Sequence, residues 1–265
     1  MDRELSDDRR LELSSAEFTH IGGRQSNQDA QANAQQDGLA CFVISDGAGG
    51  HAGGEIASGV VVKAVIDSFL LELSFGVRAL QFYVEHAIAQ VAKGKVADHQ
   101  LKDMSATVAA VLIDTENRCA LWAHLGDTRI YLFRDRRVYR ATRDHSLVQQ
   151  FVDAGYCATE ALRTHPQRNV LYAAVGTEGD TRPEVTQQTI ALHDGDAFLL
   201  CTDGFWEWVT ESEMEQSLAA ASSVDDWLRK MRAMVEEKGR HSPKSRDNYT
   251  AQALWFTDHG LAAAR

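Results

Sequence analysis

Two apolar segments of the sequence end in the same dipeptide, an aspartate followed by a glycine. Residues 41–45 lead into Asp46-Gly47, and residues 198–202 lead into Asp203-Gly204. An Asp-Gly pair is a strong signal for a two-residue hairpin turn, but such a turn must be followed at once by a second strand. Each of these pairs is followed instead by a helical pattern, so we interpret both aspartates as functional. By contrast, Asp194-Gly195 stands directly before an apolar run, which favours an ordinary turn.

Three further aspartates, Asp29, Asp127 and Asp247, stand beside predicted strands. Each alone is typical of a turn or a cap. Together with Asp46 and Asp203 they would bring five carboxylates to strand margins, where neighbouring carboxylates repel one another unless they are protonated or neutralised. All-oxygen ligands suit a hard cation such as Mg²⁺ or Mn²⁺, whereas zinc would favour histidine or cysteine. A glycine beside such an aspartate also lets its backbone carbonyl approach a metal ion.

The elements that must position these acids follow from hydrophobic periodicity. Alternating or continuous apolar runs predict strands, several of them joined by turns too short for a crossover helix. Helical spacing predicts two long helices after the first strand and shorter helices later. Strands in meanders with helices in separate blocks indicate a layered α+β fold rather than a parallel sheet. The predicted strands cover residues 39–44, 107–113, 119–124, 129–133, 137–139, 197–201 and 251–256. The predicted helices begin after Gly54 and near Leu80, and cover residues 146–154, 211–220 and 224–237.

The composition narrows the class of protein. The chain has 265 residues and a net charge of −11, the wrong sign for coating nucleic acid. Four scattered cysteines suggest neither a zinc site nor a disulfide framework, which favours the reducing cytoplasm. We expect no signal peptide and no membrane span. With three prolines and no repeat, nothing marks an interdomain linker, so we expect a single domain over residues 1–265.

The order of the short motifs resembles that of the metal-dependent Ser/Thr phosphatases of the PPM (PP2C-like) family, in its bacterial branch. The resemblance extends over about residues 15–256, and eight weak motifs in order make it specific. They stand at positions 23–29 (GRQSNQD), 45–51 (SDGAGGH), 105–107 (SAT), 125–129 (LGDTR), 144–146 (DHS), 171–176 (LYAAVG), 201–204 (CTDG) and 246–248 (RDN).

The resemblance implies a four-layer α/β/β/α sandwich of two antiparallel sheets flanked by helix pairs. It implies two Mn²⁺ or Mg²⁺ ions, with Asp46 bridging them and Asp203 and Asp247 completing the shell of the first. The Gly47 carbonyl would serve the second ion. The resemblance further implies that Asp29 holds a metal-bound water without itself being a ligand of the metal. It also implies that Asp127 and Asp203 support a third ion and that Arg24 binds the substrate phosphate.

The implied reaction is hydrolysis of phosphoserine and phosphothreonine in proteins by an activated water, in line and without a phosphoenzyme. Asp46 and Asp203 are then the catalytic residues, and they act as metal ligands. Two cations can lower the pKa of a shared water to about neutral. A guanidinium matches two phosphate oxygens in a way that lysine cannot.

The sequence also departs from the family pattern. Animal relatives carry a histidine, proposed to protonate the leaving group, where this chain has Ala48, so that role is unassigned. His51 and a metal-held water are the candidates, although a structural role for His51 is the more ordinary interpretation. Gln28 replaces an acid and brings no charge, and Ala106 replaces a glycine, which we expect to matter little.

Substrate choice and partners are expectations from the resemblance. The segment 144–168 corresponds to the variable flap of the family, whose polar side chains could contact a phosphoprotein or form a solvated lid. Bacterial members commonly oppose Ser/Thr kinases, some of them in type VI secretion clusters, so the resemblance implies such a kinase as partner. We expect a cytoplasmic monomer. The flap side chains in question are Asp153, Tyr156, Glu160, Arg163 and His165.

Two other classes of function remain to be compared with the phosphatase. Residues 47–52 fit the glycine pattern of a dinucleotide-binding strand–turn–helix, which would indicate an oxidoreductase with parallel strands. A decayed phosphatase that only binds phosphoproteins would be expected to have lost metal aspartates, and Asp46, Asp203 and Asp247 are all present. Hydrolysis of p-nitrophenyl phosphate with Mn²⁺, and after chelation, separates all three.

Overall fold

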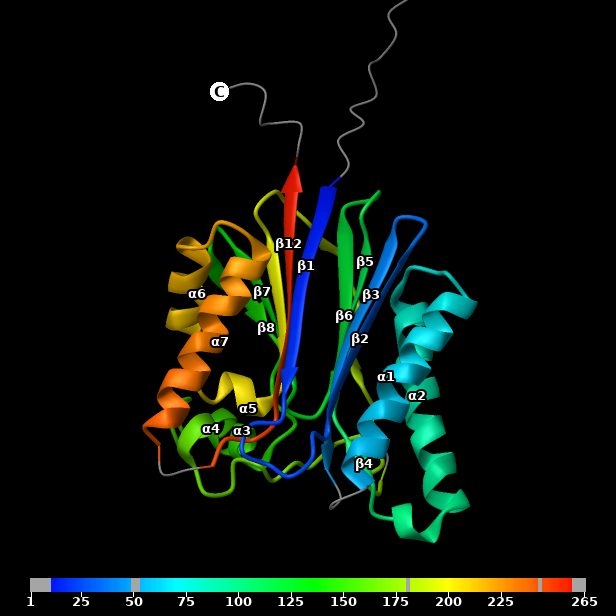
Figure 1. The fold of residues 1–265 in the computed structure, drawn as a ribbon. Helices are drawn as coiled ribbons and strands as arrows, with labels where there is room; N and C mark the ends of the chain where they lie inside the picture. The colour runs from blue at the N-terminus through cyan, green and yellow to red at the C-terminus, as the bar shows by residue number, and fades with distance from the viewer. Residues whose placement is uncertain (1–10, 49–52, 180–181, 243–244, 259–265) are drawn as a thin grey trace, which may run out of the picture.

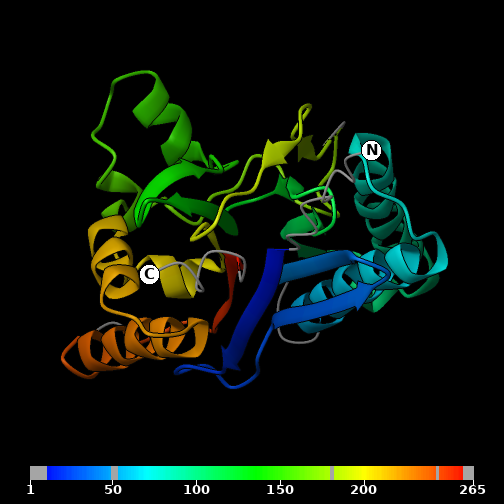
Figure 2. The same ribbon diagram turned by 90° about the horizontal axis from the view of Figure 1, so that it is seen from above.

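In the computed structural model, two antiparallel sheets lie face to face between two pairs of helices (Figures 1 and 2). The described residues are 11–48, 53–179, 182–242 and 245–258. The expected α/β/β/α sandwich is therefore confirmed. Among the described helices none is both long enough and apolar enough to cross a membrane.

The first sheet has five strands, and the pair α6 (Glu211–Ala219) and α7 (Val224–Arg240) packs on its outer face (Figure 1). Its outermost strands are β1 and β8, and β1 pairs with β12 from Leu11 opposite Asp258 to His20 opposite Tyr249. In spatial order the strands are β1 (Leu11–His20), β12 (Tyr249–Asp258), β11 (Ala197–Cys201), β7 (Arg129–Arg134) and β8 (Arg137–Ala141).

The second sheet is covered by α1 (Gly53–Leu71) and α2 (Val77–Ala97). Two short strands extend it: β4 pairs with β3, and β9 pairs with β6. In spatial order the main strands are β10 (Ile190–Ala191), β6 (Cys119–Leu125), β5 (Val108–Asp114), β3 (Leu39–Ala48) and β2 (Asp29–Gln36), with β4 at Ser105–Ala106 and β9 at Glu184–Val185.

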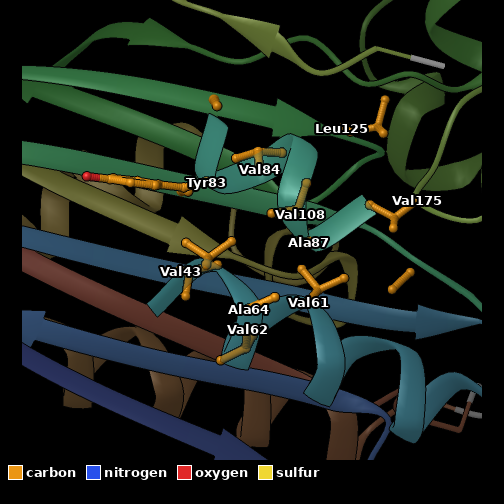
Figure 3. Close-up of a cluster of buried hydrophobic side chains, with 14 of the residues drawn as sticks. Val43, Val61, Val62, Ala64, Tyr83, Val84, Ala87, Val108, Leu125 and Val175 are labelled. Atoms are coloured by element: carbon orange, nitrogen blue, oxygen red, sulfur yellow. The ribbon is translucent and has the colours of Figure 1, made fainter. Parts of the chain in front are cut away.

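The core consists of three buried apolar layers, and β3 shows why its sequence is a continuous apolar run. Successive side chains of a strand point to opposite faces. Cys41 and Val43 therefore pack against α1 and α2, whereas Phe42 and Ile44 pack against the other sheet. Figure 3 shows Val43 beside side chains of both helices, such as Val61 and Val84. From Ala40 to Ile44 the strand is buried on both faces and has no polar side chain, which is why it is visible in the sequence as a continuous apolar run.

Two strands that the sequence analysis did not identify, β1 and β2, flank the loop that carries Arg24. The sequence of β2 is DAQANAQQ, in which alanines alternate with glutamines, aspartate and asparagine. Ala30, Ala32 and Ala34 pack toward α1 and α2. Alanine and glutamine have weak strand propensity, so tertiary packing rather than local preference forms this strand.

The short turns were predicted correctly. Asp135 and Arg136, which join β7 to β8, both have positive φ, 52° and 60°, as a two-residue hairpin turn of type I′ requires. The prediction for 39–44 was too short, because β3 continues through Asp46 and Gly47 to Ala48. Asp46 therefore lies within a strand rather than in the loop after it.

Three further helices lie at the end of the sandwich where β1 ends (Figure 1). They are α5 (Asp203–Trp206), α3 (Leu147–Asp153) and α4 (Ala161–Thr164), and a 3-10 turn spans His99–Leu101. One of the three helices, α5, begins with the predicted metal ligand Asp203. The helix predicted at 146–154 is confirmed as α3, with Ser146 as its N-cap accepting the Gln149 N–H. The helices α3 and α4 form the flap (Figure 2).

Candidate metal centre

The predicted acids meet in a cleft of about 380 Å³ at one end of the sandwich. Asp46, Asp127, Asp203 and Asp247 all line it, as do Gly47 and Arg24. Asp29 stands beside them, because it is the cross-strand partner of Asp46 in the β2–β3 ladder. The opposite end of the sandwich carries the paired residues Leu11 and Asp258 (Figure 1). Tertiary structure thus gathers acids that lie up to 218 residues apart in the sequence.

Asp46 is fixed by the backbone on both sides of β3. Its N–H donates to Thr107 Oγ1 at 2.9 Å, and its carbonyl accepts the Thr107 N–H at 2.8 Å. The next N–H, that of Gly47, donates to the Gln28 carbonyl at 3.1 Å. A Cβ at Gly47 would lie 2.1 Å from the Gly54 carbonyl oxygen, so α1 can approach only a glycine here. The glycine therefore has a packing role in addition to the carbonyl role that the sequence suggested.

Asp203 and Asp247 are brought together by close contact between α5 and the start of β12. A Cβ at Gly204 would lie 1.9 Å from the Asn248 carbonyl oxygen, so glycine is required for this contact. The Asp203 side chain is buried at the first position of α5, directly after Thr202. The Asp-Gly dipeptides thus share one function, which is to let a second segment lie directly against the acid.

Asn248 and Thr202 hold the centre together, and the sequence analysis assigned neither a role. The Asn248 amide donates to the Ile21 and Ser26 carbonyls at 2.8 and 3.0 Å, and its oxygen accepts the Gln28 N–H at 2.8 Å. It therefore ties β12 to the whole loop that carries Arg24. Thr202 Oγ1 donates to Asp29 Oδ2 at 2.9 Å. Their signal in the sequence was adjacency to Asp247 and Asp203.

The carboxylates of the cleft are held in an unfavourable electrostatic state. Burial, and then repulsion from the neighbouring acids, raises the pKa of Asp46 and Asp203 well above the ordinary range. Burial raises the pKa of Asp29 and of Asp127 to about 7. Among the described residues, none of these four forms an ion pair with a basic side chain. Within the described part of the chain, these four carboxylates therefore have no cationic side chain beside them that would neutralise their charge.

The residues present fit hard divalent cations. The donors are carboxylate and carbonyl oxygens, the ligand class that Mn²⁺ and Mg²⁺ accept. Asp29 Oδ1 is buried and has no hydrogen-bond partner among the described residues, as expected for an oxygen that faces a metal ion or its water.

Arg24 reaches into the same cleft and contacts one of the predicted ligands. Its Nη2 donates to Asp247 Oδ2 at 2.5 Å, and the Arg24 side chain is 55% exposed. The hydrogen bond to Asp247 raises the pKa of Arg24 further, and the charges of Asp203 and Asp46 contribute as well. Arg24 is thus a permanent cation at the mouth of an acidic cleft, as a phosphate-binding residue should be.

Asp127 is positioned by the backbone conformation of Gly126 and by a hydrogen bond from α5. Gly126 has a φ of +110°, and Trp206 Nε1 donates to the Asp127 carbonyl at 2.9 Å. Trp206 in turn packs under the Arg129 guanidinium, 3.5 Å from the ring centre. Trp206, two residues after Gly204, therefore links α5 to the loop of Asp127.

A second group of metal-type side chains, His124, His145 and Glu184, lies behind this loop. The two imidazoles are stacked, with centroids 4.7 Å apart and planes 10° apart. An imidazole binds metal in its own ring plane, so two stacked rings cannot direct lone pairs at one ion. Instead, His145 Nδ1 accepts the Gly126 N–H at 3.0 Å, and His124 Nε2 lies 2.9 Å from the Arg143 carbonyl oxygen. The pair thus supports the Asp127 loop.

The flap is held more firmly than a solvated lid. Arg163 of α4 donates to both carboxylate oxygens of Glu211 at 2.9 Å and to the Trp206 carbonyl at 3.1 Å. Asp153 is engaged by Arg143, whereas Tyr156 is 83% exposed. Of the flap residues considered in the sequence, Arg163 is therefore structural, and Tyr156 is freely accessible. His51 and the glycines at 49 and 50 lie outside the described residues.

The sheet topology contradicts the dinucleotide-binding alternative. Both neighbours of β3 in its sheet, β2 and β5, run antiparallel to it. A dinucleotide fold needs parallel strands joined through the helix that follows the glycine motif. Gly47, the first glycine of that motif, therefore has another use, namely to let α1 pack close to Asp46.

Comparison with known proteins identifies the family. Residues 18–246 match the family described as protein phosphatase 2C. The chain belongs to this family. Protein phosphatase PhpP of Streptococcus pneumoniae is 30% identical over 216 residues, which cover 79% of this chain and 85% of PhpP. The phosphatase class that the sequence predicted is thus confirmed, and the chain is an enzyme of the serine/threonine phosphatase type.

Solved phosphatase structures share the fold across nearly the whole chain. The catalytic domain of the serine/threonine phosphatase PstP in complex with two manganese ions has a TM-score of 0.77 and 25% identity, covering 94% of this phosphatase and 100% of that chain. PppA, described as a key regulatory component of the T6SS in Pseudomonas aeruginosa, has a TM-score of 0.75 and 26% identity over 92% of this chain and 97% of its own.

Proposed function

We propose that this phosphatase hydrolyses phosphoserine and phosphothreonine in proteins by direct in-line attack of water on phosphorus. The observation that carries the proposal is the gathering of Asp46, Asp203 and Asp247 with Arg24 in one cleft. Membership of the protein phosphatase 2C family supports the same reaction.

The chain's residues divide the work between holding cations and binding phosphate. Asp46, Asp203 and Asp247, with the Gly47 carbonyl, would hold two Mn²⁺ or Mg²⁺ ions, as PstP holds manganese. Asp127 and Asp203 would hold a third, and Asp29 would orient water from behind Asp46. Ions bound there supply Lewis acidity, which lowers the pKa of water toward neutrality and offsets phosphate charge. Arg24 would bind two phosphate oxygens and orient the ester for attack.

The side chains of the cleft favour water over a protein nucleophile. Its described lining contains no cysteine, histidine or lysine. Its three hydroxyl groups, on Ser105, Thr107 and Thr177, are engaged with other atoms. Thr177 Oγ1 donates to the Ala174 carbonyl at 2.8 Å. Thr107 Oγ1 accepts the Asp46 N–H and bonds Thr128, and Ser105 Oγ donates to the Ala48 carbonyl at 3.4 Å. A serine or threonine nucleophile needs a hydroxyl group that is free to be activated by a base, and none of the described hydroxyl groups in the lining is free.

Partners and location follow as part of the proposal. Phosphoproteins are the substrates, and the similarity to PppA supports a link to type VI secretion with an opposing Ser/Thr kinase. All four cysteines are free, which suits the reducing cytoplasm. The proposed state is a monomer.

The test compares two Asp-Gly dipeptides of this chain. Asp203→Asn should abolish hydrolysis of p-nitrophenyl phosphate and of a phosphothreonine peptide with Mn²⁺. Asp194→Asn is the matched control, because Asp194 lies outside the cleft and its Oδ1 accepts the Asp258 N–H at 2.9 Å. Chelation should abolish activity in the wild type and in the control. Full activity of Asp203→Asn, or activity that survives chelation, would reject the proposal.

A further inference from the structure

A second pocket, of about 340 Å³, lies beside the catalytic cleft and differs from it in charge. It is lined by His20, Glu236, Arg240, Arg246 and Tyr249, and we call it the basic pocket. His20 ends β1, Tyr249 begins β12, and Glu236 and Arg240 belong to the end of α7. Figure 1 shows these three segment ends at the same end of the sandwich as α5.

The basic pocket offers two unused donors in a chain whose net charge is −11. Glu236 is paired with Arg232 at 2.8 Å, and Arg240 with Glu237. Arg246 forms no ion pair with any residue that the structure describes, and its guanidinium lies 6.0 Å from the centre of the Tyr249 ring.

His20 provides the second donor. Its ring stacks on Tyr249, with centroids 4.8 Å apart. His20 Nδ1 accepts the Gly22 N–H at 2.9 Å, so the neutral ring carries its proton on Nε2. A guanidinium and an imidazole N–H are suitable donors for a carboxylate or a phosphate.

The basic pocket and the catalytic cleft are lined by neighbouring residues of the same two segments, residues 20–24 and 246–249. The Gly23 N–H donates to the Arg246 carbonyl at 2.9 Å, so these two segments run together. Arg24 and Asp247 line the cleft, whereas Arg246 lines the basic pocket. Gly22 and Gly23 put no side chain in the way, and a Cβ at Gly22 would lie 2.0 Å from the Asp247 carbonyl oxygen.

The separation between the catalytic cleft and the basic pocket suits one bound peptide, because Asp247 lines the cleft and its neighbour Arg246 lines the basic pocket. Neighbouring residues that face opposite sides place their side-chain tips roughly 10–15 Å apart, which three to five residues of extended chain span at about 3.3 Å each.

We propose that the basic pocket binds an anionic side chain of the substrate, three to five residues from the phosphorylated residue. The anion is the carboxylate of an acidic residue or a second phosphate. This proposal rests on the proposed phosphatase function and specifies its substrate class, namely phosphorylated segments that carry a nearby acidic or phosphorylated residue.

The test measures kcat/KM for phosphothreonine peptides in a neutral background. One glutamate is placed in turn at each position up to six residues on either side, and glutamine at the same position is the reference. We expect about a threefold to tenfold preference for glutamate at one or two positions, three to five residues away. The preference should shrink in 0.5 M salt, which screens charge at about 4 Å and beyond. A non-hydrolysable phosphonate residue at the same positions shows whether phosphate is preferred over carboxylate.

The variants Arg246→Gln and Arg240→Gln should each reduce the preference, because each removes one of the positive charges that line the pocket. Arg246→Gln should have the larger effect, because Arg246 has no ion-pair partner among the described residues, whereas Arg240 is paired with Glu237. Arg246 adjoins Asp247, so Arg240→Gln keeps the test independent of the metal centre. Arg229→Gln is the matched control on the same helix, because Arg229 is 73% exposed, pairs with Asp226 and lies outside the pocket. It should keep the full preference.

The outcomes separate this proposal from the proposed function. If the wild type hydrolyses p-nitrophenyl phosphate and the neutral peptide but prefers no anion at any position, the basic pocket is not a substrate site. A preference that persists in both pocket variants overturns it equally. If the wild type hydrolyses none of these compounds with Mn²⁺, the proposed function itself fails.

Discussion

Replacing Asp29 by asparagine should stabilise the metal-free protein at alkaline pH and have little effect on its stability below about pH 4. Burial raises the pKa of Asp29 from its ordinary value of 3.8 to about 7. Each pH unit between the folded and unfolded pKa corresponds to about 1.4 kcal/mol. Ionising Asp29 therefore costs the metal-free fold up to about 4 kcal/mol, which is a large share of the stability of a typical domain.

The pH window follows from the direction of the shift. A carboxyl whose pKa is raised by folding binds its proton more tightly in the folded state. The fold is therefore favoured below pH 4, loses this contribution as the pH rises to about 7, and has lost it entirely above that. Asparagine resembles the protonated acid at every pH. It can still accept the Thr202 hydroxyl proton, which Asp29 Oδ2 accepts at 2.9 Å.

Urea unfolding of the chelated protein at pH 5 and pH 8.5 measures the effect. Asp29→Asn should gain up to about 4 kcal/mol over the wild type at pH 8.5, and less than half of that, about 1–2 kcal/mol, at pH 5. Mn²⁺ should narrow the difference, because cations neutralise the wild-type cluster.

The matched control is Asp196→Asn, in the same fold but with opposite electrostatics. Asp196 is buried, and the Arg134 guanidinium donates to it at 2.9 and 2.7 Å. Removing one partner of a buried ion pair costs about 3–5 kcal/mol, so this variant should be less stable at pH 8.5. If Asp29→Asn is also destabilised at pH 8.5, or if its effect does not change with pH, the metal-free cluster is not held in a strained, unneutralised state.

Three further predictions concern the substrate, the backbone and the flap. Arg24→Ala should raise KM for a phosphothreonine peptide by about tenfold and lower kcat less. The affinity for Mn²⁺, measured by calorimetry, should be equal or tighter, because Asp247 loses its partner at 2.5 Å. An unchanged KM would argue against phosphate binding by Arg24. Gly204→Ala should lower the free energy of unfolding in urea by about 2 kcal/mol or more, because its Cβ would meet the Asn248 carbonyl oxygen at 1.9 Å. The control Gly59→Ala in α1, where a Cβ has nothing within 4 Å, should be neutral or stabilising. Equal effects of the two variants would contradict this account. Asp144→Asn should cost about 3–5 kcal/mol, because Arg129 donates to Asp144 twice at 2.8 Å in a buried site, and a loss below about 1 kcal/mol would mean that the pair is not structural.

The sequence by itself determined the chemical identity of the site and most of the regular elements. Long apolar runs such as that of β3 are buried on both faces, and such runs are visible without a structure. The aspartates at 46, 203 and 247 stood beside predicted strands, and electrostatic repulsion implied that they must be either protonated or neutralised by a cation. Their order along the chain supplied the family, which the comparison confirmed.

Only the tertiary structure decided how these residues depend on one another. The strand β2 forms because its alanines pack on helices, although its local propensity is weak. The pairing of Arg24 with Asp247, and the ties from Asn248 to Ile21, join segments more than two hundred residues apart. Such long-range contacts leave no periodic signal in the sequence, and neither does the basic pocket, where the ends of β1, α7 and β12 meet. A local pattern can reveal which side chains carry charge, but their burial and spacing, which set the pKa and the reactivity, arise only when the sheets pack together.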